Sequence, residues 1–195
     1  DALVRKLYQH TFARQKPLKV ISMTREPVGR AISSFFQNFT RDTGLSLEER
    51  NFDTEELKSL FLDQHDHYYA LLWFDNNILK NFEIDVFGKA FDPEAGFQIY
   101  QKDNVSVLVL QSELTDPQKQ EIIQQFLAFP DFLLQNENVG EAKSYSQTYQ
   151  RFKQEVRLPA TYLQYLCDSK YFRHFYSEEI SQRLHDRWAE YATQS

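Results

Sequence analysis

A short run of β-branched and apolar residues, followed at once by a helical pattern that starts with proline, constrains the fold of this chain most. Residues 18–24 (Leu-Lys-Val-Ile-Ser-Met-Thr) are typical of a buried strand. Pro27 stands where the first turn of a helix accepts proline, and apolar residues at helical spacing continue to Phe39, before Thr43-Gly44. Because a strand that passes directly into a helix is the building unit of α/β proteins, this segment predicts a sheet covered by helices.

The rest of the chain alternates between helical and strand patterns. The expected elements are helices at 57–79, from Asp116 as N-cap, at 145–156, at 160–167 and from Ser177 through Trp188, and strands at 97–100 and 105–110. We therefore predict a helix-rich α/β fold in which helices flank both sides of a mostly parallel sheet. No repeat or long linker interrupts the pattern, so residues 1–195 are expected to form a single domain.

Composition and charge exclude several classes of function. The longest strongly apolar stretches, 70–74 and 107–110, are far shorter than the roughly 20 residues of a membrane helix. Cys167 is the only cysteine, and with five scattered histidines it offers no zinc spacing, so no metal site is expected. The net charge of −6 argues against a nucleic-acid partner. With neither a membrane span nor a signal-peptide pattern, we expect a cytoplasmic protein.

The positive charge is concentrated early, where it meets the predicted strand-to-helix junction. Residues 1–50 carry a net charge of +4, and the remainder carries −10. Ligands of open α/β sheets collect where strands end and the next helix presents free N–H groups. Arg25 falls there, and its guanidinium can bind two phosphate oxygens. Arg30, Ser33 and Ser34 follow on one helix face. In the alternative interpretation, Arg25 pairs with Glu26 and the others are surface residues.

These residues carry a resemblance to a known family. Arg25, Pro27, Arg30 and Ser33 form Arg-x-Pro-x-x-Arg-x-x-Ser, which resembles the 3′-phosphate-binding motif of sulfotransferases that use 3′-phosphoadenosine 5′-phosphosulfate (PAPS). Later segments resemble sulfotransferase-like proteins of capsular polysaccharide synthesis, at residues 73–75, 83–87, 107–114, 143–146 and 174–180. The resemblance implies that Arg25 and Ser33 bind the 3′-phosphate of PAPS, or of its product adenosine 3′,5′-bisphosphate (PAP), with Arg30 in support.

The same resemblance implies a fold of the P-loop nucleotide-hydrolase type and transfer of a sulfuryl group to a hydroxyl of a glycan or a small molecule. That fold opens with a strand and a phosphate-binding loop whose lysine reaches the leaving group. None of the five glycines here belongs to a Gly-x-x-x-x-Gly-Lys-Ser/Thr pattern. We therefore expect this N-terminal strand and loop to lie before Asp1, or to be lost.

Transfer to a hydroxyl calls for a base, and histidine is the side chain best suited to that role near neutral pH. His65 and His67 are the candidates because they precede the first of the later family-like segments. Two residues apart on a helix, they would point to different faces, so only one could serve. The alternatives are that both are solvated surface residues, or that Asp75, Glu83 or Asp85 is the base or binds acceptor hydroxyls.

A late lysine and two competing functions complete the sequence-based hypotheses. The resemblance suggests that a late basic loop closes over the donor phosphate, which makes Lys143 a further candidate contact; an ordinary surface lysine is the alternative. The first competing function is a non-catalytic relative that keeps the fold for binding or assembly. The second is a kinase-like transferase of the same ancestry, which would need carboxylates arranged for magnesium.

Overall fold

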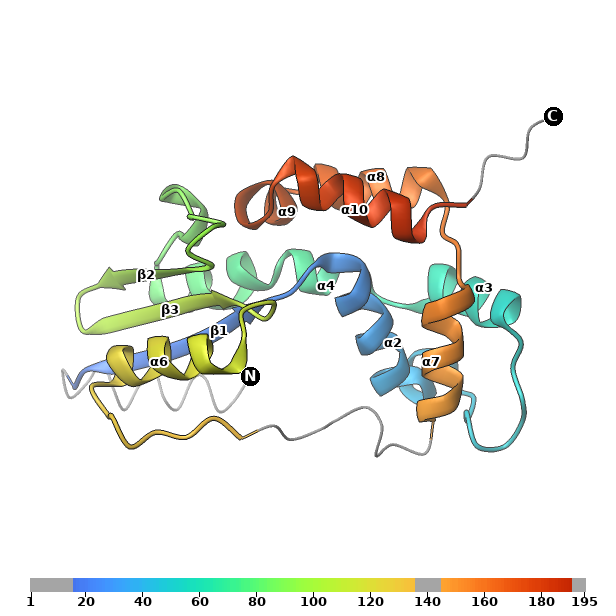
Figure 1. Ribbon diagram of the computed structural model, residues 1–195, viewed down its shortest axis with the longest axis horizontal. Coiled ribbons are helices and arrows are strands. Elements are labelled where there is room, and N and C mark those ends of the chain that lie inside the picture. Colours follow the sequence, from blue (N-terminus) through green and yellow to red (C-terminus); the bar gives the residue numbers. More distant parts are fainter. Residues whose placement is uncertain (1–15, 136–144, 191–195) are drawn as a thin grey trace. The chain divides into compact units, whose positions relative to one another are not determined.

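The strand and the helix predicted at residues 18–43 are both present in the computed structural model, which describes residues 16–135 and 145–190 (Figure 1). β1 spans Leu18–Thr24 and α2 spans Pro27–Thr43. The chain divides between these two elements into two units. The described residues of the first unit are 16–25 and 72–135, and those of the second are 26–71 and 145–190. That residues 1–195 form a single domain stays a prediction.

The first unit contains a mixed three-stranded sheet. Its strand order is β1-β3-β2, with β3 (Val105–Gln111) in the centre, parallel to β1 and antiparallel to β2 (Phe97–Lys102). The prediction of a mostly parallel sheet is therefore wrong for one of the two strand pairs. Only Asp103 and Asn104 connect β2 to β3, and strands joined by so short a turn must run antiparallel.

Helix α6 (Asp116–Leu127) covers one face of this sheet (Figure 1). Leu108 and Leu110 of β3 are fully buried against Ile123 and Phe126 of α6. The N-cap of α6 is Thr115, which forms a capping box with Gln118, so the predicted cap at Asp116 is one residue late. Short helices precede β2 in the same unit: η1 (Phe74–Leu79), α5 (Lys80–Phe82) and η2 (Val86–Gly88).

The long helical region predicted at residues 57–79 is confirmed, but it is not one continuous helix. The chain forms α3 (Thr54–Gln64) and α4 (Tyr68–Leu71) in the second unit before it enters η1 of the first unit. The Asp66 carboxylate accepts hydrogen bonds from the main-chain N–H groups of Tyr68 and Tyr69, both at 3.0 Å. An aspartate that caps N–H groups in this way starts a new helix, so the helical pattern breaks at residues 65–67.

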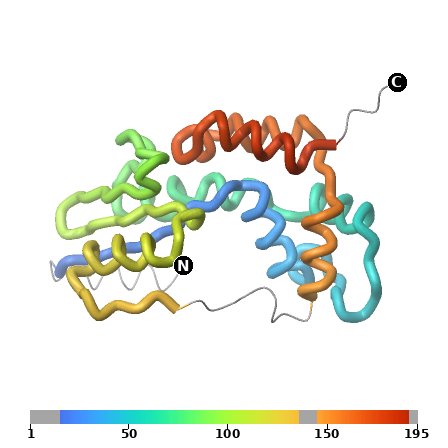
Figure 2. Tube along the Cα trace, in the orientation of Figure 1, coloured from blue at the N-terminus to red at the C-terminus, as the bar shows by residue number. Residues whose placement is uncertain are grey.

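The regular elements of the second unit, within its described residues, are helices apart from one β-bridge between Leu158 and Ala189. The unit is built from two distant stretches of chain, coloured blue to cyan and orange to red in Figure 2. The predicted late helices are confirmed as α7 (Ser146–Glu155), α8 (Ala160–Asp168) and α10 (Glu178–Trp188), and α9 (Lys170–Phe175) lies between the last two. The core is rich in fully buried aromatic side chains: Phe35, Phe36, Phe61, Phe152, Phe175 and Trp188. In the described ranges, no helix has the length and apolar character needed to cross a membrane.

Candidate functional site

Arg25 lies at the carboxyl end of β1, as the sequence predicts. Thr24 pairs with Gln111 of the parallel strand β3, so both strands end at the same edge of the sheet. Arg25 follows directly and is exposed. The Thr24 hydroxyl is buried there without a hydrogen-bond partner among the residues that the structure describes. This edge of the first unit therefore offers a guanidinium, and binding of a phosphate by Arg25 stays a prediction.

The N-terminus of α2 does not present the free N–H groups that were expected. The Glu26 carboxylate accepts hydrogen bonds from the main-chain N–H groups of Val28, at 2.9 Å, and Gly29, at 2.6 Å. These are the groups that an anion at a helix N-terminus would use. A side-chain carboxylate of the protein already fills that position, so a bound phosphate must rely on side chains or displace Glu26.

Arg30 and Ser33 belong to the second unit, where each contacts a tyrosine. The Ser33 hydroxyl lies 2.9 Å from the Tyr149 hydroxyl of α7. The guanidinium of Arg30 lies over the ring of Tyr171, 5.9 Å from its centre, and donates a long hydrogen bond of 3.5 Å to its hydroxyl. Ser34 has a different partner: its hydroxyl accepts a hydrogen bond from the Asn38 side chain. Of the two predicted serines, Ser33 is therefore the one at the interface between α2 and α7.

Tyr149 and Lys153 were not among the residues singled out from the sequence. The Lys153 ammonium lies 4.3 Å from the centre of the Tyr149 ring, so a cation, a phenol and the Ser33 hydroxyl form one cluster. A phosphate or sulfate oxygen can accept hydrogen bonds from hydroxyl and ammonium groups. The spacing Tyr-x-x-x-Lys on a predicted helix could have indicated the tyrosine–lysine pair, but nothing local indicates Ser33 as its partner.

His65 lies in the core of the second unit and is paired with a carboxylate. Its Nδ1 lies 2.8 Å from Oδ2 of Asp42, and the exposed fractions of the two side chains are 3% and 6%. Because a carboxylate only accepts, Nδ1 of His65 carries the proton that lies between the two groups. Such a pair orients a base, but this ring packs between Phe35 and Phe61 rather than facing solvent. The interpretation of His65 as a solvated surface residue is wrong.

His67 has both ring nitrogens engaged. Nε2 donates to the Phe61 carbonyl oxygen at 2.8 Å, and Nδ1 accepts from the Tyr162 hydroxyl at 2.9 Å. Burial, the largest cause, lowers the pKa of His67, and it raises that of Tyr162, so both groups stay neutral. The two histidine rings lie 5.1 Å apart instead of on opposite helix faces, because residues 65–67 form a turn.

The lowered pKa of His67 predicts a pH-dependent stability. In the unfolded chain this histidine binds a proton near its ordinary pKa of 6.5, but in the folded protein only at lower pH. The unfolded state therefore binds more protons in this window, and the free energy of unfolding should fall as the pH drops below about 6.5, by less than about 1.4 kcal/mol per pH unit. Urea unfolding between pH 7.5 and 5 measures this slope. His67→Gln should have a shallower slope, and equal slopes in the two proteins would contradict the prediction.

One predicted contact lies outside the described residues, namely Lys143. Within the described ranges, no group of three or more His, Cys, Asp or Glu side chains is placed to hold a metal ion. The structure therefore brings Ser33, Tyr149 and Lys153 together in the second unit and places Arg25 in the first. The two histidines form a separate cluster, in which His65 pairs with Asp42 and the partly buried His67 pairs with Tyr162.

Comparison with known proteins identifies a family to which the chain is similar. Residues 49–177, about two thirds of the chain, match the family model described as "Putative capsular polysaccharide synthesis protein" (NKWYS). The match includes His65, His67 and the Tyr149–Lys153 pair and begins after Ser33. No curated protein and no solved structure matches the chain at a significant level. Because the match covers more than half of the sequence, the chain belongs to this family of capsular polysaccharide synthesis proteins.

Proposed function

We propose that this protein is a sulfotransferase, which moves a sulfuryl group from PAPS to a hydroxyl of a glycan during the synthesis of a capsular or extracellular polysaccharide. Membership of the family supports a role in polysaccharide synthesis. The observation that supports PAPS as the sulfuryl donor is the arrangement of residues at the junction of β1 and α2. There, Arg25 follows a strand that lies parallel to its neighbour β3, and Ser33 stands on the helix that begins two residues later.

The donor phosphate is assigned to side chains rather than to the helix N-terminus, because Glu26 holds the N–H groups there. Arg25 and Ser33 bind the 3′-phosphate, with Arg30 in support and Lys143 as a further contact. The Ser33–Tyr149 pair fits this role, since each hydroxyl has one proton and two lone pairs and can turn to donate to an anion. Lys153 beside the Tyr149 ring adds a positive charge to the same cluster.

The reaction exchanges one sulfur–oxygen bond for another. The acceptor hydroxyl oxygen forms a bond to sulfur, the bond from sulfur to the 5′-phosphate oxygen breaks, and the hydroxyl proton passes to solvent. The products are a sulfate ester and PAP. In such transfers, positioning and neutralisation of charge supply most of the catalysis, which is what arginine, lysine and hydroxyl groups can do. His67 has no ring nitrogen left to act as a base in the observed arrangement.

Calorimetric titration of the full-length protein with PAP tests the proposal. The wild-type protein should bind PAP, and Arg25→Ala should lower its affinity about 10- to 100-fold, because a charged, two-point contact contributes about 1.5–3 kcal/mol. Arg183→Ala is the matched control: Arg183 is an exposed arginine paired with Glu179 one turn away and should leave PAP binding unchanged. Absence of PAP binding, or equal affinity of Arg25→Ala and the wild-type protein for PAP, would show that Arg25 does not bind the 3′-phosphate.

A second candidate function is a non-catalytic relative that binds a nucleotide or glycan. Two observations favour it: the Glu26 carboxylate occupies the N-terminus of α2, and both histidine candidates are hydrogen-bonded to other residues of the second unit. Incubation with radiolabelled PAPS and a pool of glycan acceptors separates the two functions. Label that appears in a glycan supports the enzyme, whereas PAP binding without transfer supports the non-catalytic protein.

A further inference from the structure

Three tyrosines form an exposed patch on the second unit. Tyr68 and Tyr69 of α4 are 59% and 60% exposed, and Tyr165 of α8 is 42% exposed. The Tyr68 and Tyr165 rings are in contact, with centres 5.6 Å apart and planes inclined at 65°. We call these three residues the tyrosine patch. Among the described residues of the second unit, every large hydrophobic side chain that is exposed belongs to this patch, and such a gathering is typical of a binding surface.

Hydrogen bonds beneath the tyrosine patch connect the two segments that carry it. His67 directly precedes Tyr68, and its Nδ1 accepts a hydrogen bond of 2.9 Å from the hydroxyl of Tyr162, which lies three residues before Tyr165 on α8. The Asp66 carboxylate in turn holds the main-chain N–H of Tyr68 at 3.0 Å. The start of α4 is therefore fixed to α8 before any ligand binds, and a surface that is already ordered loses less entropy on binding.

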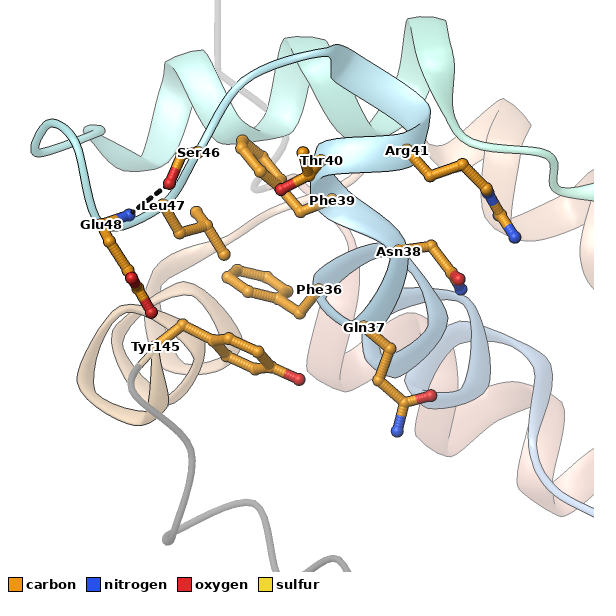
Figure 3. A pocket seen from close by; sticks show the side chains of 10 residues that line it. All are labelled: Phe36, Gln37, Asn38, Phe39, Thr40, Arg41, Ser46, Leu47, Glu48 and Tyr145. Carbon is orange, nitrogen blue, oxygen red and sulfur yellow. Dashed lines mark hydrogen bonds between the residues drawn. The ribbon is translucent and has the colours of Figure 1, made fainter.

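Two pockets of the second unit offer less ring surface than the tyrosine patch. One, of about 390 Å³, lies along the C-terminal half of α2 (Figure 3). Phe36, whose ring lies at its centre in that view, is only 2% exposed, so protein covers its faces. In the pocket beside α8 and α10, Phe172 and Tyr176 are 3% and 6% exposed. A ligand that stacks on aromatic rings therefore finds more accessible ring faces on the tyrosine patch.

A sugar ring matches the chemistry of exposed tyrosines. The faces of a tyrosine ring are apolar, and its hydroxyl can both donate and accept a hydrogen bond. A pyranose has C–H groups on its faces and hydroxyls around its rim, so it can rest on an aromatic ring while its rim meets polar groups. Thr161 and Asp168 lie within one turn of Tyr165 on either side along α8, and both are exposed. They supply a hydroxyl and a carboxylate beside the ring.

Composition and family favour a glycan over a protein as the occupant of the tyrosine patch. Protein interfaces combine tyrosine with tryptophan, phenylalanine and methionine, none of which is exposed among the described residues of this unit. The family match at residues 49–177 includes all three tyrosines. We propose that the tyrosine patch binds a pyranose ring of the acceptor glycan by stacking. This inference rests on the proposed function only in taking the acceptor glycan as the ligand.

NMR titration of the isotope-labelled full-length protein with a β-1,4-linked glucose tetrasaccharide tests the proposal. The probe should shift the amide signals of Tyr68, Tyr69 and Tyr165. Tyr165→Ala should weaken its binding about fivefold or more, whereas Tyr165→Phe keeps the ring and should stay within about twofold of the wild-type affinity. Phe129→Ala removes an equally exposed ring of the first unit and should leave binding unchanged. Equal losses in Tyr165→Ala and Tyr165→Phe would show that the ring is not a stacking surface.

The outcomes separate this inference from the proposed function. If PAP binds but the tetrasaccharide leaves the patch signals unmoved, or binds equally to Tyr165→Ala and the wild-type protein, the patch assignment is wrong and the sulfotransferase proposal stands. If the tetrasaccharide binds at the patch and PAP does not bind, the patch assignment stands and the sulfotransferase proposal is wrong. A dimer in sedimentation that Tyr68→Ala or Tyr165→Ala dissociates would identify the patch as an interface between two copies of the chain and overturn the glycan assignment.

Discussion

Phe35→Ala should lower the free energy of unfolding by about 3–5 kcal/mol, the range for removal of a buried phenylalanine ring. Phe35 has no exposed surface and is the centre of an aromatic cluster. Its ring contacts four others, with centres 5.2–6.0 Å apart: Phe36, Phe39, Phe61 and His65. The loss includes buried apolar area, edge-to-face ring contacts and the cavity that alanine leaves. Urea unfolding followed by tryptophan fluorescence measures it.

Two further variants separate packing from a general effect of phenylalanine removal. Phe35→Leu keeps most of the buried volume and should lose much less stability than the alanine variant, because a smaller cavity remains. Phe129→Ala removes a side chain that is half exposed and should change the free energy of unfolding by about 0.5 kcal/mol or less. Equal losses in Phe35→Ala and Phe129→Ala would show that the aromatic cluster does not stabilise the protein as described.

Asp42→Ala should lower the free energy of unfolding by about 2–4 kcal/mol at pH 7. The Asp42 carboxylate accepts a hydrogen bond from His65, at 2.8 Å, and both side chains are almost fully buried. Alanine would leave the Nδ1–H of His65 inside the core without a partner, and an unpaired buried donor is costly. A smaller gain offsets part of the loss, because a carboxylate in the last turn of α2 interacts unfavourably with the helix dipole.

Asp42→Asn and Asp63→Ala are the controls for this prediction. Asparagine keeps a carbonyl oxygen as acceptor for Nδ1–H and should recover more than half of the loss. Asp63 is an exposed aspartate of α3, and its replacement should have little effect on stability. If Asp42→Ala unfolds with the same free energy as Asp63→Ala, the buried pair does not contribute to stability.

Local sequence patterns predicted most of the elements correctly. The β-branched run at residues 18–24 forms β1, but among the described residues only Thr24 of this strand is buried, so the prediction of a buried strand is wrong in that respect. The apolar spacing after Pro27 forms α2 and buries Val28, Ile32, Phe35, Phe36 and Phe39. Such patterns are reliable because side-chain spacing and local backbone preference act within a few residues. The break in the helical region predicted at 57–79 was missed because Asp66 can either continue a helix or cap the next one, and both choices fit the same apolar spacing.

The predicted site fared differently, since its residues depend on distant partners. The position of Arg25 at the end of β1 followed from the local pattern. The partners of the other candidates did not: Ser33 meets Tyr149, 116 residues away, and His67 meets Tyr162, 95 residues away. His65 is a core residue because Asp42 and two phenylalanines surround it. The alternative interpretation as a solvated surface residue could not take these contacts into account.

The sequence by itself determined the alternation of strands and helices, the strand-to-helix junction that carries Arg25, and the aromatic side chains available for a core. Only the tertiary structure decided which polar groups remain for a ligand. It engaged both histidines in hydrogen bonds within the second unit and placed Glu26 on the N-terminus of α2. The physical reason is that helix and strand formation depends on neighbours along the chain, whereas a hydrogen-bond partner is selected by packing between elements far apart in sequence.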